Sequence, residues 1–420
     1  VNDNQGSYAF SDVGMGNGNY IATNRFTYKT VWDGFTLYNG YLNSNTLAYL
    51  DDSGKRNGGA GAAIFTNVTL QNCIVTDNEN SSSNAGKELR GGGVYCDEGT
   101  LVNCYIIDNT LGQDGQYTAY GGGCYMFRGT AYNCVISENE TWGQHTDGAG
   151  IFIENAEFYN NTIVKNTSHG TTRGNGGISL YNTDGSDYQS RLVIYNCIVL
   201  GNTGFTGMTG NANTAIGNRG VIECNYSITS NNQDVVNGQN AIYYDNTVIK
   251  GTSIFDDYTN GNYRLGSMDG VNMGIDEPVV NGKTIILADY TDMDFTDRIK
   301  DCRVDAGAYE RNNAENVEPE NKNGRYVYYV TWTGAGSMVA NSLDNAACAE
   351  KLQIVLNAAG EQKKKTPTEE VIVKVAGYNE KNGGFVYHSN TLADESDPQS
   401  YSYTVPYGVV LEGGYSEENN

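Results

Sequence analysis

A segment of alternating apolar and polar residues recurs along the first half of the chain. It reads LQNCIVTDN at residues 70–78, and further copies begin at Leu101, Ala131, Phe158 and Ile194. Equivalent positions 34, 73, 104, 134, 161, 197 and 226 are 39, 31, 30, 27, 36 and 29 residues apart. A period of about 30 residues is typical of solenoids, in which each repeat is one supersecondary unit.

A second, glycine-rich segment precedes most copies of the first. It reads GGGVYC at 91–96, GGGCYM at 121–126 and GAGIFI at 148–153, with apolar residues at every second position in several copies. That spacing is the period of a β-strand. Each unit therefore holds at least two short strands joined by Gly or Asn bends. Because a unit of this size cannot bury its apolar face alone, the pattern predicts an all-β solenoid of stacked coils.

Stacking would align equivalent residues in columns about 4.8 Å apart. At a bend, Asn tolerates a left-handed backbone, and its amide can bond the next coil. The first bend would hold Asn72, Asn103, Asn133, Asn160 and Asn196, and the second Asn78, Asn109, Asn139, Asn166 and Asn202. A column of small apolar side chains would contain Cys73, Cys104, Cys134 and Cys197, and an inward aliphatic column Val75, Ile106, Ile136, Ile163 and Val199.

This repeat resembles that of right-handed parallel β-helices, the pectin-lyase-like superfamily, over about residues 20–265. The resemblance implies the fold class: all-β, a right-handed parallel β-helix solenoid. It does not imply one activity, because this fold hosts lyases, hydrolases, adhesins and phage tailspikes.

The remainder of the chain resembles two other parts of such proteins. Residues 255–265 (FDDYTNGNYRL) and 304–310 (VDAGAYE) are similar to the closing segment of surface-exported bacterial β-helix proteins. The pattern of residues 344–360 predicts an amphipathic helix that ends at Gly360. This helix resembles the one that caps the first coil of such β-helix proteins. The expected organisation is coils at 1–265, a closing segment at 266–310, a linker at 311–323 and the opening segment of a second module at 324–420.

The charge balance narrows the possible partners. Against 49 Asp and Glu the chain has 26 Lys and Arg, for a formal net charge of −23. Nucleic acid and anionic lipid would repel such a surface. No stretch approaches the 18 uninterrupted apolar residues of a membrane helix, so membrane insertion is not expected. The 53 Gly and 5 Pro fit coils that bend often and whose ladders Pro would interrupt.

Catalytic and metal signatures are fragmentary. Polygalacturonase-like hydrolases, which share this fold, combine three carboxylates with Gly-His-Gly and Arg-Ile-Lys. Here Asp184, the pair Asp256-Asp257 and residues 298–300 (RIK) occur without Gly-His-Gly, so no catalytic residue is assigned. The nine cysteines form no C-x-x-C pair near a His, which disfavours zinc and favours buried free thiols; one or two disulfides between coils remain an alternative.

Aromatic residues on or beside the longer loops are candidates for ligand contact. Their rings suit stacking against a sugar or another protein; the alternative is that they only cover backbone. The loop at 182–187 (NTDGSD) has carboxylate and carbonyl oxygens suited to a structural calcium ion, and no other cofactor is expected. The candidate contacts are Tyr117, Tyr120, Tyr125, Trp142, Tyr181 and Tyr188.

These observations predict an extracellular structural or adhesive β-helix module, secreted or held on a bacterial surface. We expect it to associate end to end or with tandem neighbours, as a filament or surface array, with polysaccharide as a further candidate partner. The alternative is a carbohydrate-active or carbohydrate-binding β-helix, similar to polysaccharide lyases or glycoside hydrolases.

Overall fold

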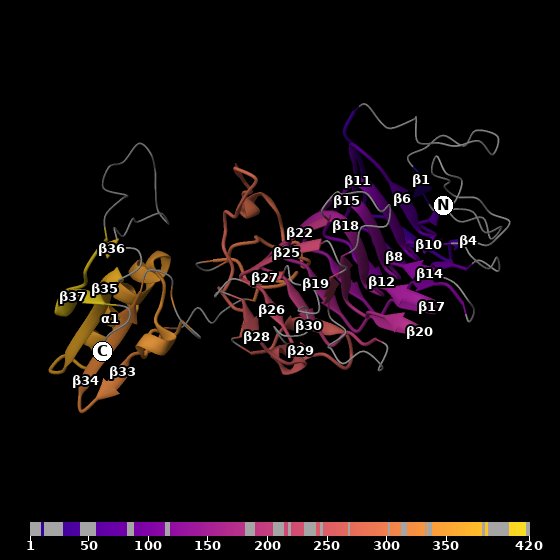
Figure 1. Ribbon diagram of the computed structural model, residues 1–420. Coiled ribbons are helices and arrows are strands. Elements are labelled where there is room, and N and C mark those ends of the chain that lie inside the picture. Colours follow the sequence, from indigo (N-terminus) through magenta and orange to yellow (C-terminus); the bar gives the residue numbers. More distant parts are fainter. Residues whose placement is uncertain are drawn as a thin grey trace. The chain divides into compact units, whose positions relative to one another are not determined.

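The chain forms two compact units in a computed structural model (Figure 1). Unit 1 comprises Val1–Arg298 and Ala306–Glu310, and unit 2 comprises Ile299–Asp305 and Arg311–Asn420. The structure describes residues 10–11, 28–42, 56–81, 88–113, 118–180, 190–204, 214–216, 220–230, 241–243, 247–267, 269–300, 303–311, 317–331, 334, 338–379, 383–384 and 403–416.

Unit 1 is built from parallel sheets whose strands come from successive coils (Figure 1). The first sheet holds the longest strands: β1 (Phe10–Ser11), β2 (Thr30–Asp33), β6 (Ala62–Ile64), β7 (Val68–Gln71), β11 (Val94–Val102), β15 (Cys124–Tyr132), β18 (Ile151–Tyr159), β21 (Ile178–Leu180), β22 (Ser190–Tyr195), β24 (Thr214–Ile216), β25 (Gly220–Asn225) and β27 (Ala241–Tyr243). The second sheet contains β3 (Thr36–Tyr38), β8 (Ile74–Thr76), β12 (Tyr105–Ile107), β16 (Val135–Ser137), β19 (Thr162–Val164), β23 (Ile198–Leu200), β26 (Ile228–Thr229) and β28 (Val248–Ile249). This arrangement confirms the predicted all-β parallel solenoid.

A third parallel sheet was not foreseen from the sequence. It consists of β4 (Tyr41–Leu42), β5 (Arg56–Gly58), β9 (Glu79–Asn80), β10 (Glu88–Arg90), β13 (Thr110–Leu111), β14 (Thr118–Tyr120), β17 (Glu140–Asp147) and β20 (Thr167–Gly174). Most of these strands are only two or three residues long. A strand that short cannot display an alternating period, so the sequence did not separate them from loops.

The core of unit 1 lies inside the coils, where the predicted columns meet. The aliphatic column is in register, for example Val75 beside Ile106 and Ile136 beside Ile163. The four residues of the cysteine column are fully buried, with Asn161 in the corresponding place on the intervening coil. Burial raises the pKa of Cys73 to about 11, so that thiol stays protonated at neutral pH. The described free cysteines are Cys73, Cys96, Cys104, Cys124, Cys134, Cys197 and Cys224, whereas Cys348 is disulfide-bonded.

After the coils, the chain of unit 1 forms short elements that pack on the second core cluster, around Ile198, Ile228 and Tyr309. They are a 3-10 turn at Thr252–Ile254, β29 (Phe255–Asp257), β30 (Asn262–Leu265), β31 (Val279–Val280), β32 (Lys283–Thr284) and a 3-10 turn at Leu287–Asp289. The segment ends in a buried ion pair, because Arg298 lies 3.1 Å from Glu310 and both side chains are almost wholly inaccessible.

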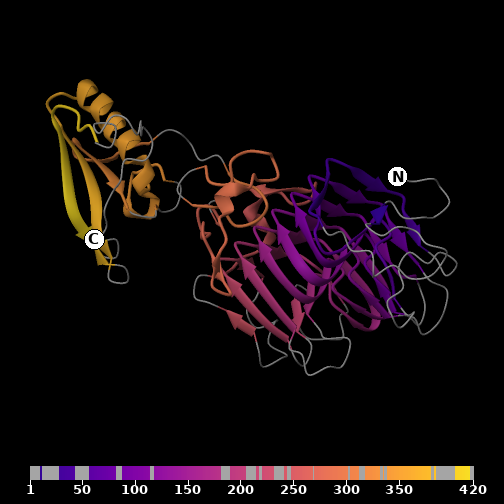
Figure 2. The same cartoon turned by 90° about the horizontal axis from the view of Figure 1, so that it is seen from above.

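Unit 2 has its own small sheet and helix. The strands are β33 (Glu320–Lys322), β34 (Arg325–Val330), β35 (Glu370–Asn379), β36 (Gly383–Gly384) and β37 (Val409–Ser416). Helix α1 (Leu352–Lys365) lies along β34, β35 and β37 (Figure 2). Two 3-10 turns, Leu343–Asn345 and Ala349–Lys351, precede it.

The predicted end of that helix is wrong. Helix α1 begins at Leu352, later than expected, and continues past Gly360 to Lys365. Gly360 is buried, and a Cβ built on it would lie 2.9 Å from the ring of Pro406. The glycine therefore permits a close approach of the segment before β37, and it does not serve as a helix stop.

Candidate functional site

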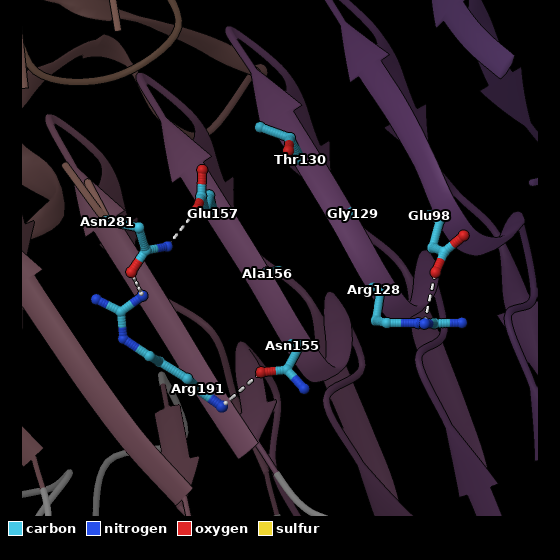
Figure 3. Close-up of a pocket in the computed structure, with 9 residues that line it drawn as sticks. All are labelled: Glu98, Arg128, Gly129, Thr130, Asn155, Ala156, Glu157, Arg191 and Asn281. Atoms are coloured by element: carbon cyan, nitrogen blue, oxygen red, sulfur yellow. Dashed lines mark hydrogen bonds and ion pairs between the residues drawn. The ribbon is translucent and has the colours of Figure 1, made fainter. Parts of the chain in front are cut away.

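A polar groove of about 580 Å³ lies on the outward face of the first sheet (Figure 3). It crosses β11, β15, β18 and β22, and one residue of the closing segment completes it. Charged and amide side chains project into it from neighbouring strands. Its lining residues are Glu98, Arg128, Gly129, Thr130, Asn155, Ala156, Glu157, Arg191 and Asn281.

Strand alternation and register bring these side chains together. On β18, Ala156 and Phe158 belong to the core, so Asn155 and Glu157 face outward. Parallel pairing places Asn155 between Arg128 of β15 and Arg191 of β22. Between these outward positions Gly129 pairs with Ala156, which faces the core, so neither adds a side chain to the groove.

A bulge in β11 aims Glu98 at the groove. The pairing of β11 with β15 shifts register on both sides of Asp97, and Glu98 adopts a left-handed backbone with φ of 66°. Bulges commonly redirect a side chain, and a left-handed Glu is sterically costly unless its surroundings hold it. The guanidinium of Arg128 does so, at 2.5 Å from Glu98 and 3.1 Å from Asp97.

Arg191 is the second guanidinium of the groove. Its Nε and Nη2 each donate to a carboxylate oxygen of Glu223 at 2.9 Å. This bidentate contact raises the pKa of Arg191 above its ordinary value. Nη1 donates to Oδ1 of Asn281 at 3.2 Å, so each nitrogen of the guanidinium has a partner.

Asn281 reaches the groove from the tip of a β-hairpin. It follows β31 and, with Gly282, forms the turn before β32; the two residues have φ of 52° and 77°. Its Nδ2 donates to Glu157 at 3.2 Å, so one amide bridges Arg191 and Glu157. Sequence reasoning missed this residue. The signal was an Asn-Gly pair between two short strands, which predicts the hairpin but not where its tip binds.

A row of tyrosines stands beside the groove on the same sheet. Tyr132, Tyr159 and Tyr195 are neighbours on β15, β18 and β22, with ring centroids 5.0 and 6.2 Å apart. Tyr290 extends the stack, 4.3 Å from Tyr132. Burial raises the pKa of Tyr159, whose hydroxyl donates to Glu157 at 3.0 Å. Because the rings stack face to face, they form a wall beside the groove and hold Glu157 in place.

The asparagines of the first bend have the predicted backbone, and their amides have two kinds of partner. Asn72 donates to Asp33 of the neighbouring coil at 2.8 Å and Asn196 to Asn160 at 3.4 Å, as predicted. Asn72, Asn103, Asn133, Asn160 and Asn196 all have left-handed φ between 50° and 56°. Several of their amides bond the segment that follows the coils. Asn103 donates to Thr291, Asn133 to the Thr291 carbonyl at 2.8 Å, and Asn196 exchanges two bonds with the Ile275 backbone. The first bend therefore fastens the closing segment.

The asparagines of the second bend form the continuous amide ladder. The left-handed residues there are the preceding ones, such as Asp108 and Glu138. The side chains point inward, and each Nδ2 donates to Oδ1 of the next coil at 2.8 to 2.9 Å. The ladder runs through Asn78, Asn109, Asn139, Asn166 and Asn202.

The aromatic candidates from the sequence do not line this groove. Tyr120 is buried with its ring 4.4 Å from Phe152, and Tyr125 is fully buried against Arg90, so neither ring is open to a ligand. Trp142 is half-buried in the third sheet and stacks on His169 at 3.7 Å. Tyr117, Tyr181, Tyr188 and the calcium candidate at 182–187 lie outside the described residues.

The groove is suited to hydrogen bonding. Four carboxylates, Asp97, Glu98, Glu157 and Glu223, surround two guanidinium groups. Within the part of the chain that the structure describes, no group of three or more His, Cys, Asp or Glu is placed to hold a metal ion. Over the same residues, no helix is long and apolar enough to cross a membrane.

Comparison of the chain with protein-family models, curated proteins and solved structures finds no match. Likeness to the pectin-lyase-like superfamily therefore remains a resemblance of the repeat.

Proposed function

We propose that this chain is a non-catalytic, adhesive β-solenoid module that holds a polysaccharide in the groove of its first sheet. The observation that carries the proposal is that the acidic groups of the groove are already engaged. Glu98 is bonded to Arg128, Glu223 to Arg191, and Glu157 to Tyr159 and Asn281. A glycosidase needs one carboxyl group to deliver a proton and another to attack or activate water. Carboxylates tied to guanidinium, phenol and amide donors suit binding better than proton transfer.

An extracellular location, secreted or on a bacterial surface, fits this proposal. Cys348 is disulfide-bonded, and disulfides persist chiefly in oxidising compartments. The net charge of −23 keeps such a surface away from nucleic acid and anionic lipid. The pectin-lyase-like superfamily is the family that we propose for the fold, on the likeness of its repeat.

Filling the groove tests the function. Thr130 faces outward in the groove, so we expect Thr130→Trp to weaken polysaccharide binding at least tenfold in affinity electrophoresis. Thr100→Trp is the matched control, because Thr100 is the register partner of Thr130 on β11 and does not line the groove. Equal binding by both variants would contradict the proposal, and release of new reducing ends by the unaltered chain would favour the carbohydrate-active alternative.

End-to-end association is a second candidate, favoured by apolar side chains at two sheet edges. Among the described residues β2 pairs only with β7, and β37 only with β35. Val31 and Tyr38 of the first coil are 53% and 51% exposed, and Val410 and Leu411 of β37 are 40% and 43% exposed. An open edge with apolar side chains is a template for another strand. We propose that β37 of one copy pairs with β2 of the next.

Light scattering after size-exclusion chromatography tests this association. We expect the unaltered chain to show a mass that grows with concentration, and Leu411→Lys to shift it toward the monomer. A lysine on an edge strand opposes pairing with another chain. Ile354→Lys is the control, since Ile354 is 45% exposed on helix α1. A monomer at all concentrations would end this second candidate.

A further inference from the structure

We propose that the groove selects an uncharged, hydroxyl-rich saccharide and rejects acidic polysaccharides. This inference rests on the proposed function, namely that the groove holds a polysaccharide. It starts from the imbalance of charge, since four carboxylates surround two guanidinium groups on this face of the sheet. A carboxylate on the ligand would enter a site that already carries excess negative charge.

Both arginines are already paired with carboxylates of the protein. Arg128 is shared between Asp97 and Glu98, through different nitrogens. Arg191 has both Nε and Nη2 on Glu223 and its third nitrogen on Asn281. An acidic ligand that reached the remaining N–H donors would share the guanidinium with a protein carboxylate and would lie close to that like charge. Its attraction to the arginine would therefore be offset by repulsion from the carboxylates.

Two uncharged groups of the groove also remain open to a ligand. Thr130 and Asn155 both line the groove. Asn155 uses its Oδ1 to accept from the backbone N–H of Arg191 at 3.1 Å, which leaves its Nδ2 without a partner among the described residues. The Thr130 hydroxyl likewise has no partner there. Together they offer one amide donor and one hydroxyl, the complement of the hydroxyls of a neutral sugar.

The carboxylates then contribute as acceptors. A carboxylate has about four lone-pair sites, and Glu157 lines the groove with two of them used, by Tyr159 and Asn281. Sugar hydroxyls can donate to the remaining sites. Hydrogen bonds to an ionised acceptor are stronger than neutral ones, so a neutral ligand gains from the same groups that repel an acidic one.

The test uses pairs of polysaccharides that differ only in charge. Polygalacturonate and alginate are compared with their carboxyl-reduced forms, and neutral mannan, xylan and glucan complete the panel. We expect at least one neutral polymer to bind at least tenfold more tightly than either acidic polymer at low salt. We also expect the difference to shrink as salt screens the repulsion. Thr130→Val and Asn155→Ala should each weaken binding of the neutral polymer about fivefold, whereas Thr100→Val should not.

The second part of the test removes the negative charges of the groove. Glu98→Gln with Glu157→Gln should raise affinity for the acidic polymers relative to the neutral ones, with folding checked by circular dichroism. Equal or tighter binding of the acidic polymers by the unaltered chain would overturn the charge selection and leave the binding function intact. Binding of no polymer in the panel would overturn both.

Discussion

We expect replacement of Asn139 by Leu to lower the free energy of unfolding by about 3 kcal/mol, because the substitution interrupts the amide ladder in the middle of the solenoid. Oδ1 of Asn139 accepts from the backbone and side chain of Asn109, and its Nδ2 donates to the Ile106 carbonyl and to Asn166. Leucine fills a similar volume but leaves the N–H of Asn109 buried without the acceptor that Asn139 supplies, and removes the bond to the Ile106 carbonyl. A buried polar group without a hydrogen-bond partner costs about 1–3 kcal/mol of stability.

Urea unfolding followed by circular dichroism measures this effect as a lower midpoint. Gln113→Leu is the control, since Gln113 is exposed and, among the described residues, bonds only Glu79, at 3.1 Å. For this variant we expect a change within about 0.5 kcal/mol. Asn139 is not in the left-handed region, so loss of backbone tolerance does not enter the comparison. Similar midpoints for the two variants would show that the ladder contributes little.

Breaking the ion pair of the closing segment gives the other large effect. The side chains of Arg298 and Glu310 are 0% and 2% exposed, and Arg298 also donates to the Gly307 carbonyl at 2.6 Å. Removal of one charge of a buried pair leaves the other charge without this ion pair. Such a loss typically costs about 3–5 kcal/mol of stability. We therefore expect Arg298→Met and Glu310→Leu each to lower the thermal midpoint of unit 1 strongly.

The double variant and a surface pair test the cause. Arg298→Met combined with Glu310→Leu leaves no stranded charge, so we expect it to be more stable than either single variant. Arg264 pairs with Asp294 at the surface, where its side chain is 46% exposed, and Arg264→Met should cost no more than about 1 kcal/mol. If the effects of the two buried substitutions simply add, the stranded-charge explanation fails.

The columns could be predicted because their cause is local. Strand alternation and a 30-residue period place Val75, Ile106 and Ile136 in one inward column without reference to other parts of the chain. The left-handed backbone at the first bend could be predicted from its asparagines, because the cost of that conformation depends on the residue type alone. The third sheet escaped detection because its strands are mostly too short to show a period.

The groove could not be predicted because its parts come from pairing and from a distant hairpin. Arg128 and Arg191 are separated by 63 positions in the sequence, and only the register of β15, β18 and β22 places them on either side of Asn155. The bulge that aims Glu98 inserts a residue into the alternation, so a strict period of two would have assigned that side chain wrongly.

By itself, then, the sequence determined the solenoid, its stacked columns and its acidic charge. These follow from periodicity and composition, which the order of residues carries directly. Only the tertiary structure decided that the second-bend asparagines form the amide ladder, that first-bend amides fasten the closing segment, and that Asn281 completes the groove. Each of these depends on contacts between residues that a long stretch of chain separates. Such contacts depend on the packing of the whole unit and cannot be predicted from a local sequence pattern.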